Sequence, residues 1–316
     1  MAETRRAIVT GGAGFIGSHV LDALIAESWE GVAIDDLSSG SARRVPDQAS
    51  LEVLDITDRD ALDRTVDAVR PAVIFHLAAQ ASVIRSVADP ARDCEVNVLG
   101  TLRVLEAATR HGAQVIFTST GGALYGDGAP IPTTEDFMPA PLSPYGASKW
   151  AAEAYVGTWR EANGLPNAVC RLGNVYGPRQ NPHGEAGVVA IFSHRLWRGE
   201  APTLFGFGEP TRDYVHVHDV ARALLACVGT AGTFNVSTGV ETSVAQLFQG
   251  LQDAAGTSLD PVLAPLRTGE LERSCIDPSR AAAELRWHAE VDLQEGLRQT
   301  YRALIEEFGS SGGSAA

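Results

Sequence analysis

The sequence contains almost no lysine. Lys149 is the single lysine among 25 basic residues, and every other basic side chain is an arginine. Arginine keeps its proton and presents a rigid fork of donors, whereas lysine is a compact charge on a flexible stem. Because the chain uses arginine at every other basic position, an ammonium group at position 149 indicates a chemical requirement. Lys149 is therefore the first candidate for a catalytic side chain.

Other absences restrict the class of protein. The 316 residues carry a net charge of −14, so the chain lacks the basic excess that binding to nucleic-acid phosphates requires. No apolar run approaches the ~20 residues of a membrane span. Cys94, Cys170, Cys227 and Cys275 do not have the spacing of metal ligands or of a disulfide framework. A strand pattern begins almost at the N-terminus, which leaves no room for a signal peptide. We therefore expect a cytoplasmic protein that binds neither nucleic acid nor a membrane.

Strand and helix patterns alternate along the first half of the chain. Short apolar runs predict strands at 6–10, 31–34, 51–54, 73–77, 114–119 and 167–171. Helical patterns follow the first strand to about residue 26 and occur again at 58–69, at 92–111 and from Tyr145 onward. This alternation is typical of a parallel, doubly wound α/β sheet of the Rossmann type.

The pattern becomes irregular after residue 172. Helices are predicted at about 188–198, 220–227 and 244–254, and short strands at 203–205, 213–217 and 233–236. We expect three parts, listed here with their bounds: a dinucleotide-binding Rossmann domain at 1–172, a smaller mixed α/β substrate domain at 173–308 with segments that return to the first domain, and a flexible tail at 309–316.

A glycine-rich turn joins the first strand to the first helix. Gly11, Gly14 and Gly17 would let backbone amides approach a pyrophosphate at the positive end of the helix. A tight turn alone would also need glycine, but Asp35 ends the second strand near the ~20-residue offset expected for a carboxylate that binds a ribose hydroxyl. No arginine directly follows Asp35, which favours NAD over NADP, although Arg43 and Arg44 lie further on.

Tyr145 and Lys149 are four residues apart and share one face of the predicted helix. A cation beside a phenol favours the phenolate and lowers the pKa of the tyrosine, which makes a general base. Ser119 and Thr120 end the fifth strand, at the carboxyl edge of the sheet where ligands bind in open α/β folds. We therefore predict a catalytic group made of these four residues.

His216, His218 and Asp219 are a possible metal site. Strand alternation would place the two histidines on one face, and Asp219 would be the N-cap of the next helix. We favour this structural interpretation and expect no metal.

Eight motifs occur in one order along nearly the whole chain: Thr10–Gly17, Asp55–Ile56, His76–Ala79, Tyr145–Lys149, Asn174–Arg179, Gly184–Val189, Arg212–Val217 and Arg267–Glu270. Together they resemble the extended short-chain dehydrogenase/reductase family and, within it, the UDP-glucose 4-epimerases. The resemblance implies that Tyr145 is the catalytic base, that Lys149 activates it and holds the nicotinamide ribose, and that Thr120 hydrogen-bonds the reacting hydroxyl. The segment after Thr120 carries one residue more than the compact form, so Ser119 could share this role.

The resemblance also implies a bound NAD and a UDP-sugar substrate. The expected NAD contacts are Gly11, Gly14, Phe15, Ile16, Gly17, Asp35, Asp36, Ser38, Gly40, Asp55, Ile56, Leu77, Ala78, Ala79, Gln80, Asn97, Tyr145 and Lys149. The expected substrate contacts are Asn174, Arg179, Val188, Val189, Thr203, Arg212, Arg267, Glu270 and Ser274. Arg212 and Arg267 would clamp the diphosphate, since arginine forks suit phosphate oxygens. The family further implies a homodimer through the helices at 97–111 and 145–163.

Ser274 bears on the choice of sugar. In the family, the position seven residues after Arg267 lines the hexose, and a small residue there admits an N-acetyl group. If the register differs by one residue, Ser274 would instead face solvent.

Three alternatives to a UDP-glucose 4-epimerase have to be considered. A UDP-glucuronate 4-epimerase would share all of these motifs. A sugar-nucleotide dehydratase or decarboxylase of the same family would place an acid beside the catalytic threonine, where this chain has Gly121 and Gly122. An inactive NAD-binding regulator would be expected to have lost Tyr145, Lys149 or Thr120, and all three are present.

Overall fold

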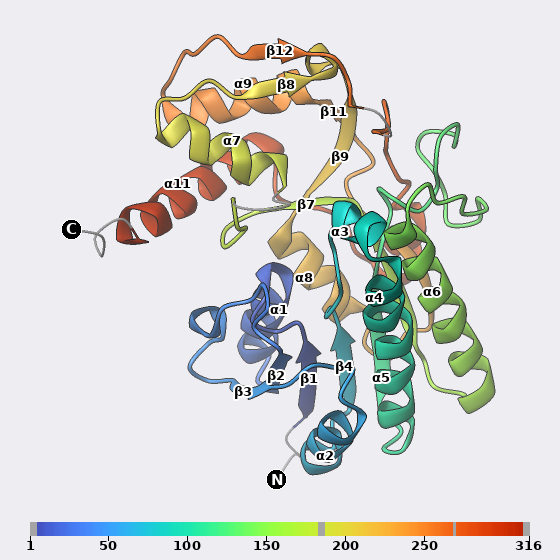
Figure 1. Ribbon diagram of the computed structural model, residues 1–316. Helices are drawn as coiled ribbons and strands as arrows, with labels where there is room; N and C mark the ends of the chain where they lie inside the picture. The colour runs from blue at the N-terminus through green and yellow to red at the C-terminus, as the bar shows by residue number, and fades with distance from the viewer. Residues whose placement is uncertain (1–4, 183–186, 268–269, 312–316) are drawn as a thin grey trace.

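A seven-stranded sheet forms the centre of the protein (Figure 1). The computed structural model describes residues 5–182, 187–267 and 270–311. The strands are β1 (Arg6–Thr10), β2 (Glu30–Asp35), β3 (Ser50–Val53), β4 (Val73–His76), β5 (Gln114–Thr120), β6 (Ala168–Leu172) and β10 (Gly232–Val236). Their order is β10-β6-β5-β4-β1-β2-β3, and every neighbouring pair is parallel. This confirms the predicted parallel α/β fold.

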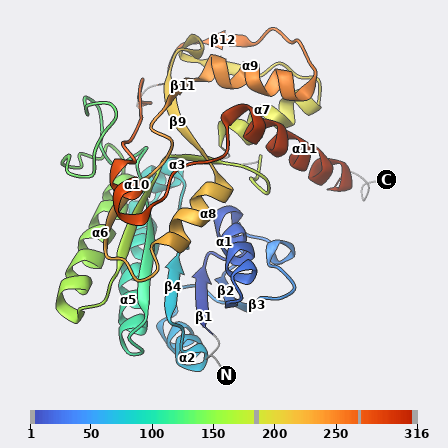
Figure 2. The ribbon, with the colours of Figure 1, turned by 180° about the vertical axis from the view of Figure 1, so that it is seen from behind.

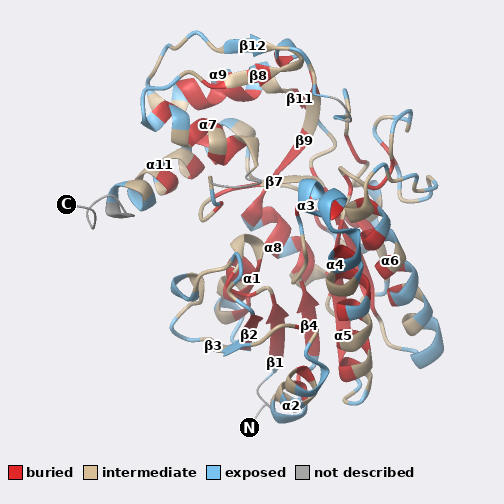
Figure 3. Ribbon diagram, viewed as in Figure 1, coloured by how far each residue is buried: buried red, intermediate tan, exposed pale blue. Residues whose placement is uncertain are grey.

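Helices cover both faces of this sheet (Figures 1 and 2). The helices of one face are α1 (Phe15–Ala26), α8 (Val217–Ala226) and α10 (Ser279–Leu285), and those of the other are α2 (Arg59–Val69), α5 (Gly100–Thr109) and α6 (Pro144–Asn163). Successive residues of a strand point to opposite faces, so Val9 packs with α1 and α8 whereas Ile8 packs with α2 and α5. The inner strands are buried on both sides for this reason, as Figure 3 shows, whereas the edge strand β3 is largely exposed.

A second group of elements lies above the carboxyl ends of the strands (Figure 1). It contains β7 (Asn174–Tyr176), β8 (Thr203–Phe205), β9 (Thr211–His216), β11 (Glu241–Ser243), β12 (Val262–Ala264), α7 (Val188–Trp197), α9 (Val244–Ala255) and α11 (Leu293–Ser311). The strands form one sheet in the order β11-β9-β7 and a pair of β8 and β12. Phe192, Phe248 and Leu297 bury their side chains in one core between the three helices. In the part of the chain that the structure describes, no helix has the length and apolar character needed to cross a membrane.

One expected feature of the domain division is present, and one boundary differs from the sequence prediction. Strand β10 leaves the second group and pairs with β6 in the central sheet, so the chain does return to the first domain; the division at residue 172 itself stays a prediction. Helix α11 continues through Ser311. The predicted flexible tail is therefore wrong for residues 309–311, and residues 312–316 lie outside the described part.

The helix predicted at 92–111 is interrupted. The structure has α4 (Pro90–Cys94), a π-helical turn η2 (Glu95–Leu99) and then α5. A single π turn depends on tertiary packing and is common at functional sites, and this one contains Asn97. A further helix, α3 (Val83–Ala88), was not predicted, because its apolar side chains are exposed and leave no buried stripe.

The fold brings two cysteines together that the sequence spacing separates. Cys170 in β6 and Cys227 after α8 are both buried, and their sulfur atoms lie 3.4 Å apart as free thiols. The contact results from α8 packing on the sheet, which no local spacing indicates.

His76 ends β4 and is 1% exposed. Its Nδ1 contacts the Thr10 hydroxyl at 2.7 Å and its Nε2 contacts the Thr101 hydroxyl at 3.0 Å. Burial, together with the positive charge of Lys149, lowers the pKa of His76 to about 3. The native protein therefore keeps His76 neutral at a pH where the unfolded chain takes up a proton.

We predict that this histidine makes the protein acid-sensitive. The unfolded state binds more protons than the native state between the ordinary histidine pKa near 6.5 and about 3, so the free energy of unfolding falls as pH falls through this window. Between pH 5.5 and 4, the free energy of unfolding of His76→Asn should fall less steeply than that of the native protein, by roughly 1.4 kcal/mol per pH unit. Urea unfolding at several pH values measures both slopes, and parallel curves would contradict the assignment.

Candidate active site

The loop between β1 and α1 can only be built with glycine. Gly11 has φ +71°, and a Cβ there would lie 2.8 Å from the backbone nitrogen of Ala78. A Cβ at Gly17 would overlap the carbonyl oxygen of Gly11. Gly14 is the N-cap of α1 and provides no side-chain cap, so Phe15 and Ile16 begin the helix with backbone N–H groups facing outward from its positive end.

Asp35 lies beside this loop at the end of β2. Its Oδ2 accepts a hydrogen bond from the Ala13 N–H at 3.0 Å, and its Oδ1 accepts one from the Leu37 N–H at 2.8 Å. Burial raises the pKa of Asp35 above its ordinary value, although these N–H groups oppose the shift. The following loop is shaped by Asp36, whose Oδ1 accepts from both the N–H and the hydroxyl of Ser38. Directly after Gly40, the Ser41 N–H donates a backbone hydrogen bond to the Ala13 carbonyl at 2.9 Å.

The loop after β3 contributes Asp55 and Ile56. Burial opposes the charge of Asp55, but the Thr57 N–H and the Arg92 guanidinium, 2.9 Å away, hold the pKa of its carboxyl below the usual value. Ile56 is buried against Gly100 at the start of α5. Asp55 therefore ties this loop to α4 through Arg92, a partner that the sequence analysis did not identify.

The residues after β4 are held from two sides. The N–H groups of Leu77 and Ala78 donate to the Thr10 hydroxyl at 3.2 Å. Asn97 accepts from the Gln80 N–H and donates to the Gln80 carbonyl, both at 2.9 Å. The side chains of Gln80 and Asn97 thus bond within the protein, while Ala78 and Ala79 leave room beside the glycine loop. A helix N-terminus, a buried carboxylate and small residues arranged in this way fit a dinucleotide such as NAD.

Tyr145 and Thr120 form the centre of the predicted catalytic group. Helix α6 begins with Ser143 as its N-cap and Pro144 in its first turn, and this start places Tyr145 opposite the end of β5. Tyr145 is half-buried, and the Thr120 side chain hydrogen-bonds its hydroxyl. Ser119 points to the other face of the strand, where its buried hydroxyl has no hydrogen-bond partner among the described residues.

The electrostatics differ from the sequence prediction. The Lys149 ammonium donates to the Thr118 carbonyl at 2.9 Å and lies 4.7 Å from the centre of the Phe117 ring. Burial lowers the pKa of Lys149 to about 8. Burial, and then the carboxylate of Asp93, raise the pKa of Tyr145 to about 12, while Thr120 lowers it. The net shift of the Tyr145 pKa is therefore opposite to the expected one, because desolvation of the phenolate dominates and Lys149 is not among the causes of the shift. That Lys149 activates Tyr145 stays a prediction.

A hollow of about 460 Å³ opens next to Thr120. Gly121 and Gly122 line one side, and Glu270 and Ser274 line the other. Asn174 lies against the same loop, since a Cβ at Gly122 would be 3.5 Å from its Oδ1. Three of the predicted substrate contacts therefore gather within one region beside the catalytic group.

This arrangement agrees with the comparison to known families. The model of the NAD dependent epimerase/dehydratase family matches residues 7–237. A UDP-glucose 4-epimerase from Mycolicibacterium smegmatis is 45% identical over 303 residues, covering 93% of this chain and 97% of the relative. The chain belongs to the NAD-dependent epimerase/dehydratase family. The resemblance seen in the sequence is thereby confirmed.

Solved structures of this family share the whole fold. The UDP-glucose 4-epimerase from Thermotoga maritima with UDP-glucose is 44% identical, with a TM-score of 0.93 over 96% of this chain and 99% of that one. The UDP-glucose 4-epimerase from Thermus thermophilus with NAD is 42% identical, with a TM-score of 0.88 over 95% of this chain and 99% of that one. Nearly the whole of this chain therefore shares its architecture with enzymes of the family.

The predicted diphosphate arginines have protein partners. Arg212 donates to the Thr211 carbonyl at 2.7 Å. Arg267 lies 3.7 Å from the centre of the Phe205 ring and 3.5 Å from a carboxylate oxygen of Glu270. The Arg212 guanidinium also lies 3.5 Å from the Glu272 carbonyl, so both arginines lie close to described residues of the 266–274 segment.

Other predicted substrate contacts lie further apart. Arg179 donates to Asp22 of α1 at 2.7 Å. Val189 is buried in the core of the second group of elements, while Val188 and Thr203 are half-buried. The motif residues 184–186 and 268–269 lie outside the described part of the chain.

The histidine motif is arranged differently from the prediction. His216 ends β9 as the N-cap of α8, and its Nδ1 accepts from the His218 N–H at 3.4 Å. His218 and Asp219 lie in the first turn of α8, so the expected strand face and the Asp219 cap are both wrong. Asp219 instead accepts from Arg222 at 2.7 Å. Within residues 5–182, 187–267 and 270–311, no group of three or more ligating side chains is arranged to hold a metal ion.

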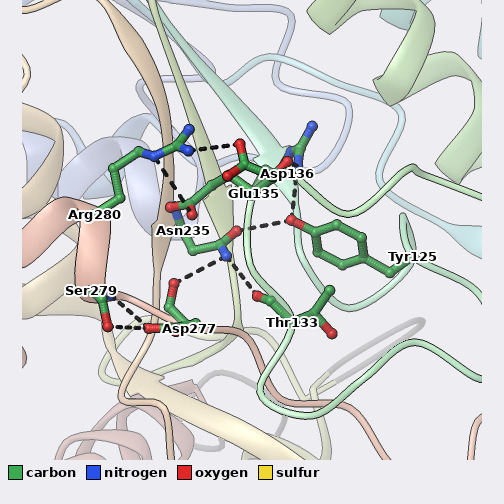
Figure 4. Close-up of polar contacts among 9 residues, drawn as sticks. Tyr125, Thr133, Glu135, Asp136, Asn235, Asp277, Ser279 and Arg280 are labelled. Atoms are coloured by element: carbon green, nitrogen blue, oxygen red, sulfur yellow. Dashed lines mark hydrogen bonds and ion pairs between the residues drawn. The ribbon is translucent and has the colours of Figure 1, made fainter.

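A polar network that sequence reasoning missed supports the loop after Thr120. Asn235 of β10 accepts from the Tyr125 hydroxyl at 3.2 Å and donates to the carbonyls of Thr133 and Asp277, as Figure 4 shows. Arg171 of β6 also donates to the Tyr125 hydroxyl, at 2.8 Å. The bonds join residues up to 110 positions apart in the chain, so no local motif indicates them. They fix the wall of the hollow that follows Thr120.

Proposed function

We propose that this protein is an NAD-dependent UDP-sugar 4-epimerase that interconverts UDP-glucose and UDP-galactose through a 4-keto intermediate. One observation carries the proposal: Tyr145 and Thr120 share a hydrogen bond beside Lys149, at the carboxyl end of β5 and next to a glycine cradle. The UDP-glucose 4-epimerases that the chain resembles over nearly its full length support the same activity.

The chain's own residues would move the proton of the sugar. The Thr120 hydroxyl hydrogen-bonds Tyr145, so a substrate hydroxyl in the same place would pass its proton to Tyr145 in its phenolate form, which the enzyme must reach although burial raises the pKa of the phenol to about 12. NAD held in the glycine cradle supplies reversible hydride acceptance at C4, which allows a change of configuration without net oxidation. Tyr145 returns the proton when the new configuration forms. Lys149, anchored to the Thr118 carbonyl, holds a positive charge one helical turn away.

The geometry favours epimerisation over the related reactions. Gly121 and Gly122 directly follow Thr120 and supply no carboxylate for elimination or decarboxylation. The hollow is lined by the carboxylates of Asp127, Glu270 and Glu272, and Arg273 there already pairs with Glu241. A uronic acid would add a negative charge to this surface, so a neutral hexose is favoured over UDP-glucuronate. The intact catalytic group speaks against an inactive NAD-binding regulator.

The substrate would be held at its diphosphate. Arg212 and Arg267 each have an exposed or partly exposed guanidinium near the 266–274 segment, and bidentate bonds to phosphate oxygens would replace their weaker contacts. Asn174, Glu270 and Ser274 lie beside the hollow and would contact the nucleotide and sugar. Arg179, Val188, Val189 and Thr203 are the remaining proposed contacts.

The protein would work in the cytoplasm as a homodimer. Its four cysteines are free thiols, which suits a reducing compartment. Trp150 and Tyr155 of α6 are 38% and 40% exposed, and Leu99 before α5 is also exposed. Exposed aromatic and aliphatic side chains along these helices favour pairing with a second copy.

Tyr145→Phe should lower the turnover number by at least ~100-fold, because the phenol provides the acid–base group. Conversion of UDP-galactose to UDP-glucose, followed by NMR, measures the rate. Tyr155→Phe removes a hydroxyl from the exposed face of the same helix and should keep the native rate. A Tyr145→Phe enzyme of near-native activity would refute the mechanism.

Ser274→Tyr should remove activity toward UDP-N-acetylglucosamine while UDP-glucose is still converted. Overfilling a packed pocket costs ~1–3 kcal/mol, which corresponds to roughly 5- to 150-fold in relative kcat/KM. Arg267→Ala is the control, since it removes an anchor common to both substrates and should raise both KM values. Equal losses in Ser274→Tyr, or no loss, would exclude Ser274 from the sugar pocket.

Light scattering should give twice the 33.4 kDa chain mass. Trp150→Glu should yield monomers, because a charge would be buried in the interface. Trp197→Glu changes an exposed tryptophan on α7 instead and should stay dimeric. A monomeric native protein would disprove the dimer.

A further inference from the structure

A buried carboxylate lies beside the catalytic group, and no step above uses it. Asp93 of α4 is 1% exposed. Its Oδ1 accepts from the Gln80 side chain at 2.8 Å and from the Asn97 side chain at 3.1 Å. Its Oδ2 is buried without a hydrogen-bond partner among the residues that the structure describes. Burying a carboxylate with one oxygen unpaired is costly, so its place beside the catalytic group has to be explained.

Asp93 is joined to the catalytic helix by a short relay. The Asn97 side chain that donates to Asp93 also donates to the Ser148 hydroxyl at 3.1 Å. The Ser148 hydroxyl in turn donates to the backbone carbonyl of Tyr145 at 3.0 Å. The same Asn97 holds the Gln80 backbone. The relay therefore fixes the first turn of α6 against the 77–80 loop.

Four titratable groups lie near Lys149 and could change the pKa of its ammonium group. Glu153 lies one turn later on α6, where Arg171 pairs with it through bonds of 2.7 and 3.1 Å, and its charge raises the pKa of Lys149 less than the charge of Asp93 does. His76 of β4 stays neutral because burial lowers its pKa. Tyr145, one turn earlier on α6, is protonated at neutral pH. Asp93 of α4 has no ion-pair partner in the described part of the chain, so its charge is not balanced by an arginine.

The negative charge of Asp93 has opposite effects on the charged forms of Lys149 and Tyr145. A carboxylate favours the ammonium form of a lysine and disfavours the phenolate form of a tyrosine. Asp93 accordingly raises the pKa of Lys149 against the larger effect of burial, and it adds to the burial that raises the pKa of Tyr145.

We propose that Asp93 is a positioning residue for the Tyr145–Lys149 pair. Through Asn97 and Ser148 it holds the first turn of α6, and its unbalanced charge keeps Lys149 in the ammonium form inside a buried site. The catalytic part of this assignment rests on the proposed epimerase function, while the effect on Lys149 is measurable without turnover.

The single lysine of the sequence allows a direct test. Protein labelled with ¹³Cε-lysine gives one NMR signal from Lys149, whose titration midpoint is expected near the pKa of about 8. Asp93→Asn keeps the shape of the side chain and an acceptor for Gln80 and Asn97 but removes the charge. Its Lys149 midpoint should fall by roughly 1 pH unit, and the alkaline limb of the pH–rate profile should fall with it.

Asp89→Asn is the matched control. Asp89 is the exposed N-cap of the same helix, where its Oδ1 accepts from the Arg92 N–H at 3.0 Å, and asparagine caps equally well. This variant should keep the native midpoint. Asp93→Glu retains the charge and should also stay close to the native value.

Each outcome decides the proposal. An unchanged Lys149 midpoint in Asp93→Asn overturns it, and a moved midpoint with an unmoved alkaline limb overturns the catalytic part. Asp93→Ser is made alongside in case the asparagine variant does not fold, and failure of both to fold would assign Asp93 to stability alone. If the wild-type protein epimerises no UDP-hexose, the proposed function fails while the NMR midpoint still tests the charge effect.

Discussion

The site depends on one hydrogen bond between a helix and the central sheet. The Lys149 ammonium donates to the Thr118 carbonyl at 2.9 Å, two residues before Thr120 on the same strand. This bond sets the rotation and height of α6 relative to β5, so that Tyr145, one turn earlier, meets the Thr120 side chain. Lysine suits this place because its stem crosses the apolar layer at Phe117 and delivers a small ammonium, whereas the wide guanidinium fork of arginine would need more donors satisfied.

Charges buried around this bond explain the architecture of the neighbouring loops. Arg171 and Glu153 form a buried ion pair between β6 and α6, and Arg171 also bonds Tyr125 of the loop after Thr120. Buried ion pairs rarely add stability by themselves, but they specify one arrangement because any other leaves a charge unpaired. The polar network on Asn235 extends this specification to β10. The wall of the hollow that follows Thr120 is thus fixed from the central sheet.

Local patterns predicted the parts of the site that lie within one turn or one helix. The glycine loop, the Tyr145–Lys149 spacing and Asp35 at a strand end are short-range features, and each lies where the sequence indicated. The misses have a common physical origin. The π turn at Asn97 and the helical position of His218 both depend on packing between distant segments. Propensity and periodicity contain no information about such contacts.

The sequence by itself determined the family and the fold class and singled out the proposed acid–base pair, because these follow from residue types at fixed short spacings. Only the tertiary structure decided the charge states. Whether a cation lowers the pKa of Tyr145 depends on how deeply both groups are buried and on which other charges lie near them. Burial and the carboxylate of Asp93 reversed the expected direction. Electrostatic energy in a low-dielectric interior depends on distances through space, and the chain sets those distances only once it has folded.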